Sequence, residues 1–189
     1  MITIEPIEIP GMHRIIPHVF SDNRGKYRKY YERKIFNDYG INDIFTESSE
    51  IHSQKGVIRG LHYQTGNNSQ SKLVHILKGK IFDVAVDLRK DSETFGMFHC
   101  ELLDSTVDKL LYIPKGFAHG FLSLEDDTLF SYQSAGAYEP ENSGGIIWND
   151  SEMNIPWPLK EYDIQNIIVT EKDSNWPTLK EYRKMNGGE

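Results

Sequence analysis

The sequence predicts a mainly β fold of sandwich or barrel type, most simply a jelly roll. Aromatic residues make up 12% of the chain, and at least six short segments in its middle alternate apolar and polar residues. Turn residues separate these segments at regular spacing, as in sandwiches and barrels. Helical periodicity is weak by comparison. A length of 189 residues fits one domain, so we treat residues 1–189 as a single unit.

The clearest strand is expected over residues 80–89. There Phe82 and Val84 fall on one face and Asp83 and Asp87 on the other. A Lys-Gly break at residues 78–79 indicates a hairpin leading into this strand. The other expected strands are residues 57–64, 72–77, 109–113, 118–124 and 128–133, with turns at 114–116 and 125–127.

Two short peripheral helices are expected, over residues 32–39 and 177–185. Residues 1–17 form an N-terminal arm in which isoleucines alternate with other residues, a pattern that suits an added edge strand. That strand could lie in the chain's own sheet or on a partner subunit.

Composition and charge exclude several classes of function. The net charge of −7 argues against nucleic-acid binding, which needs a basic face. There is no run of about 18 apolar residues, so no transmembrane helix or membrane partner is expected. The first residues lack a basic and apolar leader, which makes the cytoplasm the expected compartment. A single cysteine, Cys100, can form neither an internal disulfide nor a thiolate metal site.

Strand alternation brings several chemically useful side chains to shared faces. His119 shares a face with Phe121, Tyr132 with Phe130, and Lys72 with its apolar neighbours. If these faces point inward, they form an apolar cavity with a few polar groups, as in a small-molecule site. The alternative from pattern alone is a core tyrosine, a surface lysine and structural histidines.

Residues 114–119 (PKGFAH) resemble the second motif of the cupin superfamily, a jelly-roll fold. Metal-binding cupins carry a second histidine and a glutamate in their first motif. Here the corresponding stretch is His62-Tyr63-Gln64, so the second imidazole is missing. Because three protein ligands are usual at a catalytic divalent site, we expect no bound metal.

Taken together and in order, these segments resemble the dTDP-4-dehydrorhamnose 3,5-epimerase family, cupin-fold isomerases of nucleotide-sugar biosynthesis. The resemblance spans about residues 19–177. It rests on residues 20–25 (FSDNRG), 56–64 (GVIRGLHYQ), 72–74 (KLV), 79–92 (GKIFDVAVDLRKDS), 94–96 (TFG), 113–121 (IPKGFAHGF), 148–150 (WND), 155–158 (IPWP) and 171–173 (EKD), together with Tyr132 and Tyr138.

The resemblance implies a reaction at C3 and C5 of a nucleoside-diphosphate 4-keto-6-deoxy-hexose. His62 would be the base, held by Asp173, and Tyr132 the acid on the opposite face of the sugar. Lys72 would stabilise the oxyanion and His119 would bind the sugar. No cofactor is implied, because the reaction has no net redox change.

The resemblance also implies a nucleotide subsite and a homodimer. Arginines suit a diphosphate, because a guanidinium can bind phosphate through two parallel hydrogen bonds. Without the resemblance, the simpler interpretation is that Arg59 and Arg24 form ion pairs on the surface. The resemblance also implies that the N-terminal arm crosses to the partner subunit and that Arg24 could be donated by a neighbouring subunit. The residues assigned to substrate binding in this way are Arg59, Arg24, Tyr27, Tyr138, Glu47, Ser49 and Lys172.

Departures from the family pattern leave alternatives open. The family usually has Gln-Asp-Asn at residues 47–49, a carboxylate at Lys29 and Ser143, and Arg at His75. The family uses residues 47–49, 29 and 143 around the nucleotide, so the nucleotide could be dTDP or another such as CDP. The other readings are a single-centre epimerase, a 3,4-ketoisomerase, a non-catalytic sugar-binding cupin and a metal-dependent oxygenase.

Overall fold

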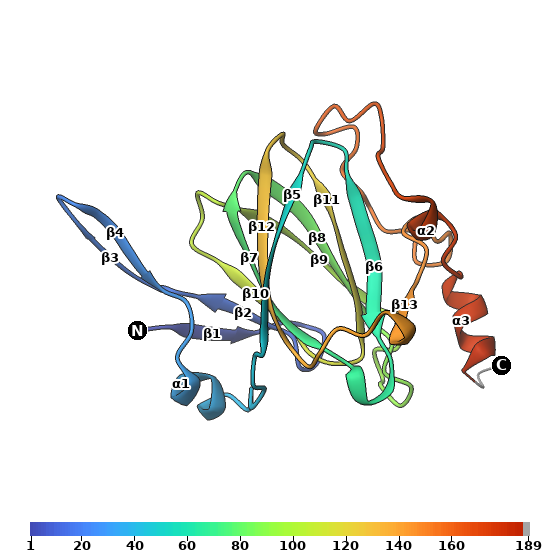
Figure 1. The fold of residues 1–189 in the computed structure, drawn as a ribbon, viewed down its shortest axis with the longest axis horizontal. Helices are drawn as coiled ribbons and strands as arrows, with labels where there is room; N and C mark the ends of the chain where they lie inside the picture. Colours follow the sequence, from blue (N-terminus) through green and yellow to red (C-terminus); the bar gives the residue numbers. More distant parts are fainter. Residues whose placement is uncertain (187–189) are drawn as a thin grey trace.

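The computed structural model describes residues 1–186, and two antiparallel sheets face each other there as a flattened barrel (Figure 1). The six-stranded sheet has the order β1 (Thr3–Pro6), β2 (His13–Ile16), β10 (Leu110–Ile113), β7 (Ser71–Lys78), β12 (Thr128–Ala135) and β5 (Glu47–Ser53). The five-stranded sheet has the order β13 (Ser143–Gly145), β6 (Ile58–Gln64), β11 (Phe117–Ser123), β8 (Lys80–Asp87) and β9 (Phe98–Asp104).

The predicted mainly β fold is confirmed, and each of the six expected strands is present with its ends shifted by two residues or fewer. The structure adds two strands to the middle of the chain, β5 and β9. In their sequences, ESSEIHS and FHCELLD, polar or charged residues occupy positions that would have to be apolar for a period-two pattern to predict a strand. The expected helices are α1 (Arg33–Asp38) and α3 (Leu179–Met185), and a four-residue helix, α2 (Glu171–Ser174), precedes α3 and packs beside β6.

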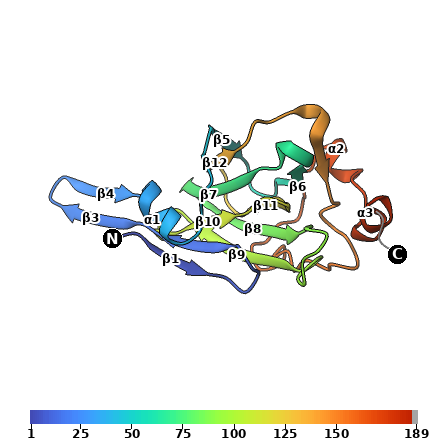
Figure 2. The ribbon, with the colours of Figure 1, turned by 90° about the horizontal axis from the view of Figure 1, so that it is seen from below.

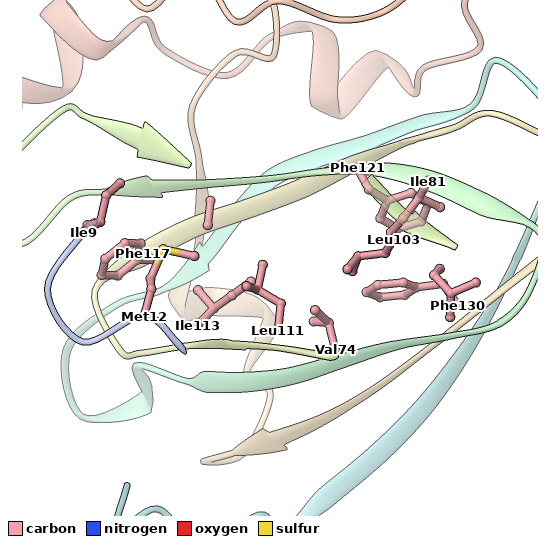
Figure 3. Packing of buried hydrophobic residues seen from close by; sticks show 12 residues of the cluster. Ile9, Met12, Val74, Ile81, Leu103, Leu111, Ile113, Phe117, Phe121 and Phe130 are labelled. Carbon is pink, nitrogen blue, oxygen red and sulfur yellow. The ribbon is translucent and has the colours of Figure 1, made fainter. Parts of the chain in front are cut away.

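The core lies between the two sheets (Figure 3). Val74, Leu111 and Ile113 extend from the six-stranded sheet, and Ile81 and Phe121 extend from the five-stranded sheet. All five are at least 97% buried. Burying such side chains contributes about 1.5–3 kcal/mol each, so this layer fixes how the sheets face each other.

Each sheet is also covered on its outer face. Helix α1 and its neighbours pack on the six-stranded sheet through Phe36 and Ile41. Residues 146–182, with Ile146 and Leu179, cover the five-stranded sheet. Within residues 1–186, no helix is long and apolar enough to cross a membrane.

The N-terminal arm lies in the chain's own sheet, which is one of the two arrangements that the sequence left open. β1 pairs with β2, and β2 pairs with β10. Ile4 and Ile15 are buried against α1. The segment that projects away from the barrel is instead the hairpin of β3 (His18–Asp22) and β4 (Gly25–Lys29), as both views show (Figures 1 and 2). This hairpin forms a sheet of its own.

A buried charge cluster joins edge strand β9 to the other sheet. The Glu101 carboxylate accepts hydrogen bonds from Arg14 Nε at 2.7 Å and Nη2 at 2.9 Å, and it pairs with Lys109 at 2.6 Å. His99 lies 3.1 Å from the same carboxylate. Burial alone would raise the pKa of Glu101, but these partners outweigh burial and hold its pKa well below the ordinary value. Ion pairs therefore hold the two sheets together on this side of the barrel.

Removing this carboxylate should destabilise the fold. Glu101→Gln leaves Arg14 and Lys109 without their shared counter-charge, and we expect a loss of about 2–3 kcal/mol in the free energy of unfolding. This is below the cost of breaking a fully buried pair, because Arg14 retains 31% of its side-chain exposure. Urea denaturation measures the change, with exposed Glu93→Gln as control. Equal midpoints for the two variants would contradict a structural role for the cluster.

Candidate active site

A cavity of about 340 Å³ opens between the two sheets, with polar side chains on both walls. β6 and β11 supply His62 and His119 from one sheet, at directly paired positions. β7 and β12 supply Lys72 and Tyr132 from the other sheet. The remaining residues around the cavity are Ile51, Arg59, Tyr63, Gln64, Gln70, Gly120, Phe121, Phe130, Tyr138, Ser143, Thr170, Lys172 and Asp173.

Two glycines allow the histidine-bearing strands to meet. A Cβ on Gly60 would lie 2.7 Å from the Cα of Gly120, and one on Gly120 would lie 2.5 Å from a backbone oxygen of β6. Gly60 also has a φ of +122°, which residues with a side chain rarely adopt. Any other residue at these positions would push β6 and β11 apart and separate His62 from His119.

His62 and Asp173 form a hydrogen-bonded pair. His62 Nε2 donates to Asp173 Oδ1 at 2.6 Å, which leaves Nδ1 as the nitrogen that can accept a proton. Asp173 is 4% exposed, and burial alone would raise the pKa of its carboxyl. Hydrogen bonds from His62, the Gly60 N–H and Trp176 outweigh burial and lower that pKa, so the carboxylate is ionised at neutral pH.

The short helix α2 fixes the position of this carboxylate. Thr170 is its N-cap and accepts a hydrogen bond from the Asp173 N–H at 3.2 Å. Asp173 therefore lies in the first turn of a helix that packs beside β6, and its Oδ2 accepts from the Gly60 N–H at 3.2 Å. Besides His62, the carboxylate therefore has two donors, the Gly60 N–H and Trp176 Nε1.

His119 is held in a similar way by a fully buried carboxylate. Its Nε2 lies 2.8 Å from Oδ2 of Asp83, whose side chain is 0% exposed. Burial lowers the pKa of His119 more than Asp83 raises it, so this imidazole is neutral at pH 7. Neutral imidazole suits hydrogen bonding to a sugar better than proton transfer. Oδ1 of Asp83 has no hydrogen-bond partner among the described residues.

Lys72 and Tyr132 lie together on the facing wall. The Lys72 ammonium is 5.7 Å from the centre of the Tyr132 ring. Burial lowers the pKa of Lys72 to about 8, and the nearby Asp83 opposes this shift. Lys72 thus keeps most of its charge at neutral pH, in a place where little water screens it.

The mouth of the cavity collects several of the predicted nucleotide-binding residues. Arg59 donates to Ser53 Oγ at 3.2 Å and to the His52 carbonyl at 3.1 Å, and it lines the cavity. Tyr138 and Lys172 also line the cavity. Glu47 accepts a hydrogen bond from the Tyr138 N–H, and Ser49 pairs in register with Tyr132.

Arg24 and Tyr27 lie elsewhere. Both belong to the projecting β3–β4 hairpin, outside the cavity of their own chain. The Arg24 side chain is 85% exposed and pairs only locally, with Asp22 at 2.6 Å. The expectation that these two residues bind substrate is therefore not met within a single chain.

Sequence reasoning missed three residues of the site, namely Asp83, Thr170 and Trp176. Asp83 could have been found, since alternation places it on the face of β8 opposite Phe82 and Val84. Thr170 could have been recognised as a Thr directly before an acidic first turn. Nothing in the pattern points to Trp176.

No metal-binding group of three or more His, Cys, Asp and Glu side chains occurs within residues 1–186. The two histidines each pair with one carboxylate on their own side of the cavity. The chemistry that this cavity supports with its own groups is acid–base, because the His62 imidazole, the Tyr132 phenol and the Lys72 ammonium surround one space.

A jelly-roll barrel with such a cavity is the arrangement of a cupin-type isomerase, and the comparisons with known proteins give the same class. The family model for dTDP-4-dehydrorhamnose 3,5-epimerase matches residues 6–181. The chain belongs to this family. A dTDP-4-dehydrorhamnose 3,5-epimerase of Methanothermobacter thermautotrophicus is 42% identical over 173 residues, covering 92% of each chain.

Solved structures agree with the sequence relatives. The dTDP-4-dehydrorhamnose 3,5-epimerase of Elizabethkingia anophelis has a TM-score of 0.89 at 39% identity, covering 95% of this chain and 97% of its own. A Legionella pneumophila epimerase in complex with dTDP-4-keto-L-rhamnose has a TM-score of 0.89 at 36% identity, covering 95% and 94%. The predicted cupin jelly roll and isomerase class are thus confirmed.

The Lys72 ammonium should titrate near pH 8. In protein whose lysines carry ¹³C-methyl groups, we expect one signal to titrate at about pH 8 and to be absent from Lys72→Gln. Asp83→Asn should lower this midpoint further, because it removes the charge that opposes the effect of burial. The exposed Lys78 provides a control. A midpoint above pH 10 for Lys72 would contradict its burial.

Proposed function

We propose that this chain inverts C3 and C5 of dTDP-4-dehydro-6-deoxyglucose to give dTDP-4-dehydrorhamnose. The observation that carries this proposal is the placement of the His62–Asp173 pair and the Tyr132 phenol on facing walls of one cavity. Inversion of a carbon centre requires a base and an acid on opposite sides of the ring. The family membership and the dTDP-sugar bound to the Legionella relative support the same substrate.

Each inversion consists of two proton transfers. His62 Nδ1 removes the proton from a carbon beside the C4 ketone, and the electron pair of the C–H bond moves onto the carbonyl oxygen as an enolate. Tyr132 then donates its phenolic proton to that carbon from the opposite face. The tyrosinate takes a proton from solvent and the imidazolium releases one to solvent, so the cycle has no net redox change.

The charges around the cavity lower the barrier to these transfers. Asp173 stabilises the imidazolium and holds the ring in one orientation. Lys72 stabilises the enolate oxygen, and by analogy with oxyanion-hole donors its removal should cost about 2.7–4 kcal/mol, or a factor of 10²–10³ in kcat. Neutral His119 binds the sugar, while Arg59 and Lys172 bind the diphosphate at the mouth.

Solvent isotope uptake tests the reaction directly. Wild-type protein incubated with dTDP-4-keto-6-deoxyglucose in heavy water should place deuterium at both C3 and C5. Label at one carbon only would indicate a single-centre epimerase, and no label would contradict the epimerase proposal. Comparing the affinities for dTDP and CDP then tests the nucleotide, and tight CDP binding without dTDP binding would contradict a dTDP-sugar.

Removing the base should separate binding from turnover. We expect His62→Asn to lose at least about 10³-fold in kcat while dTDP affinity changes by less than a few-fold, because the imidazole acts in the transition state. His52→Asn is the matched control, since its side chain is exposed and does not line the cavity. Equal losses in both variants would favour a structural effect over a catalytic one.

We also propose that two copies of the chain form the working unit, with each β3–β4 hairpin completing the partner's site. The hairpin projects from the barrel, exposes Phe20 and Tyr27 by about 60% each, and carries Arg24 at its tip. An exposed pair of aromatic rings beside an arginine suits a nucleotide base and its phosphates. A cytoplasmic location is proposed too, supported by the lone, half-buried Cys100.

Mixing two defective chains tests the shared site. Arg24→Ala lacks the hairpin arginine and His62→Asn lacks the base, so each homodimer should have greatly reduced activity. A mixed dimer carries one complete site, and random exchange should restore about a quarter of wild-type activity. The control is a mixture containing one chain with both substitutions and one His62→Asn chain, which has no complete site. No recovery in the first mixture would show that Arg24 does not act across subunits.

A further inference from the structure

The indole of Trp176 contacts three parts of the site at once. Its Nε1 donates to Asp173 Oδ1 at 3.3 Å, the same oxygen that accepts from His62. Its ring meets the His62 ring edge-to-face, with the centroids 6.2 Å apart. Lys172 lies over the indole, with Nζ 5.2 Å from the ring centre. The base, its carboxylate and a cation at the cavity mouth therefore share one neighbour.

The surrounding backbone makes room for this ring. Gly145 in β13 lies against the indole, and a Cβ there would come within 2.5 Å of it. On the other side, Trp176 is followed by Pro177, whose carbonyl accepts from the Ile147 N–H. The ring is thus held between β13 and the α2–α3 connection, and it forms part of a shallow outer cleft with Tyr63.

We propose that Trp176 is a positioning residue for the epimerisation. Its N–H holds Asp173 and His62 in a fixed relative position, and its ring supports Lys172. This rests on the proposed role of His62 as the base. Trp176 does not line the cavity. It acts through the residues that do.

The N–H of Trp176 should also set how strongly the base holds its proton. Two donors on one carboxylate oxygen share its negative charge, so each is bound less strongly than it would be alone. Without the indole N–H, Asp173 Oδ1 would interact with the His62 imidazolium alone and stabilise it more. The imidazole would then remain protonated to higher pH.

Other charged and titratable groups that face this pair come from every wall of the cavity, and Trp176→Phe substitutes none of them and keeps an aromatic ring beside Lys172. They are Arg59 and Tyr63 on β6, Lys72 on β7, His119 on β11, Tyr132 on β12, Tyr138 after β12, and Lys172 on α2. A shift seen on changing Trp176 alone is therefore due to the indole.

Trp176→Phe removes the N–H and keeps an aromatic ring. We expect kcat to fall about threefold to tenfold, as for loss of one hydrogen bond, and the acid limb of the kcat/KM profile to move to higher pH. KM should change less than twofold. Trp176→Leu also loses the ring over Lys172, and we expect KM to rise about twofold to fivefold.

Trp157→Phe is the matched control. It removes the same N–H group, which here donates to the Trp148 carbonyl at 2.9 Å, outside the cavity. This control should leave the pH profile in place even where stability falls. A Trp176→Phe profile that superimposes on wild type, or an equal shift in Trp157→Phe, would overturn the proposal.

NMR titration of His62 in substrate-free protein separates this proposal from the proposed function. The signal absent from His62→Asn should titrate at higher pH in Trp176→Phe than in wild type, whether or not dTDP-sugar is turned over. Should Trp176→Phe not fold, benzothienylalanine at position 176 in a Trp148→Phe, Trp157→Phe chain removes only the N–H. An unmoved His62 titration there would equally overturn the proposal.

Discussion

The site depends on the close approach of two strands, β6 and β11, at Gly60 and Gly120. No side chain fits between the strands at that point, so the backbones meet and His62 lies directly beside His119. Every other part of the cavity is arranged around this pair of imidazoles. Asp173 reaches one from α2, Asp83 reaches the other from β8, and the facing sheet adds Lys72 and Tyr132. Each imidazole thus has its own carboxylate, but the His62 side chain is 38% exposed while His119 is buried, and this burial keeps His119 neutral.

Much of this arrangement follows from strand alternation. Parity along β7, β11 and β12 places Lys72, His119 and Tyr132 on faces shared with apolar residues, and the structure has all three around one cavity. The fold class is equally accessible, because six segments carry the period-two pattern. What parity could not supply is the carboxylate of Asp173, which lies 111 residues from His62 in sequence and reaches it from outside the barrel. Only the resemblance to a family joined these two residues.

Two of the remaining misses, Asp83 and strand β9, share one physical cause, which is charge placed inside the fold. On β8, Phe82 and Val84 face the covering C-terminal segment, while Asp83 points into the barrel, the reverse of what hydropathy favours. On β9, His99 and Glu101 point inward for the same reason. Such groups are costly to bury without partners, and each here has one. A pattern based on apolar burial therefore does not detect β9, and on β8 it predicts the strand but not that Asp83 faces inward.

The two sheets are complete by Gly145, yet the carboxylate that pairs with His62 belongs to a four-residue helix, α2. The barrel and the Asp173 carboxylate therefore belong to different stretches of the chain. A segment outside the sheets can open locally at a lower free energy than the whole barrel. Mild heat should then lower turnover at a temperature where the β structure is still intact.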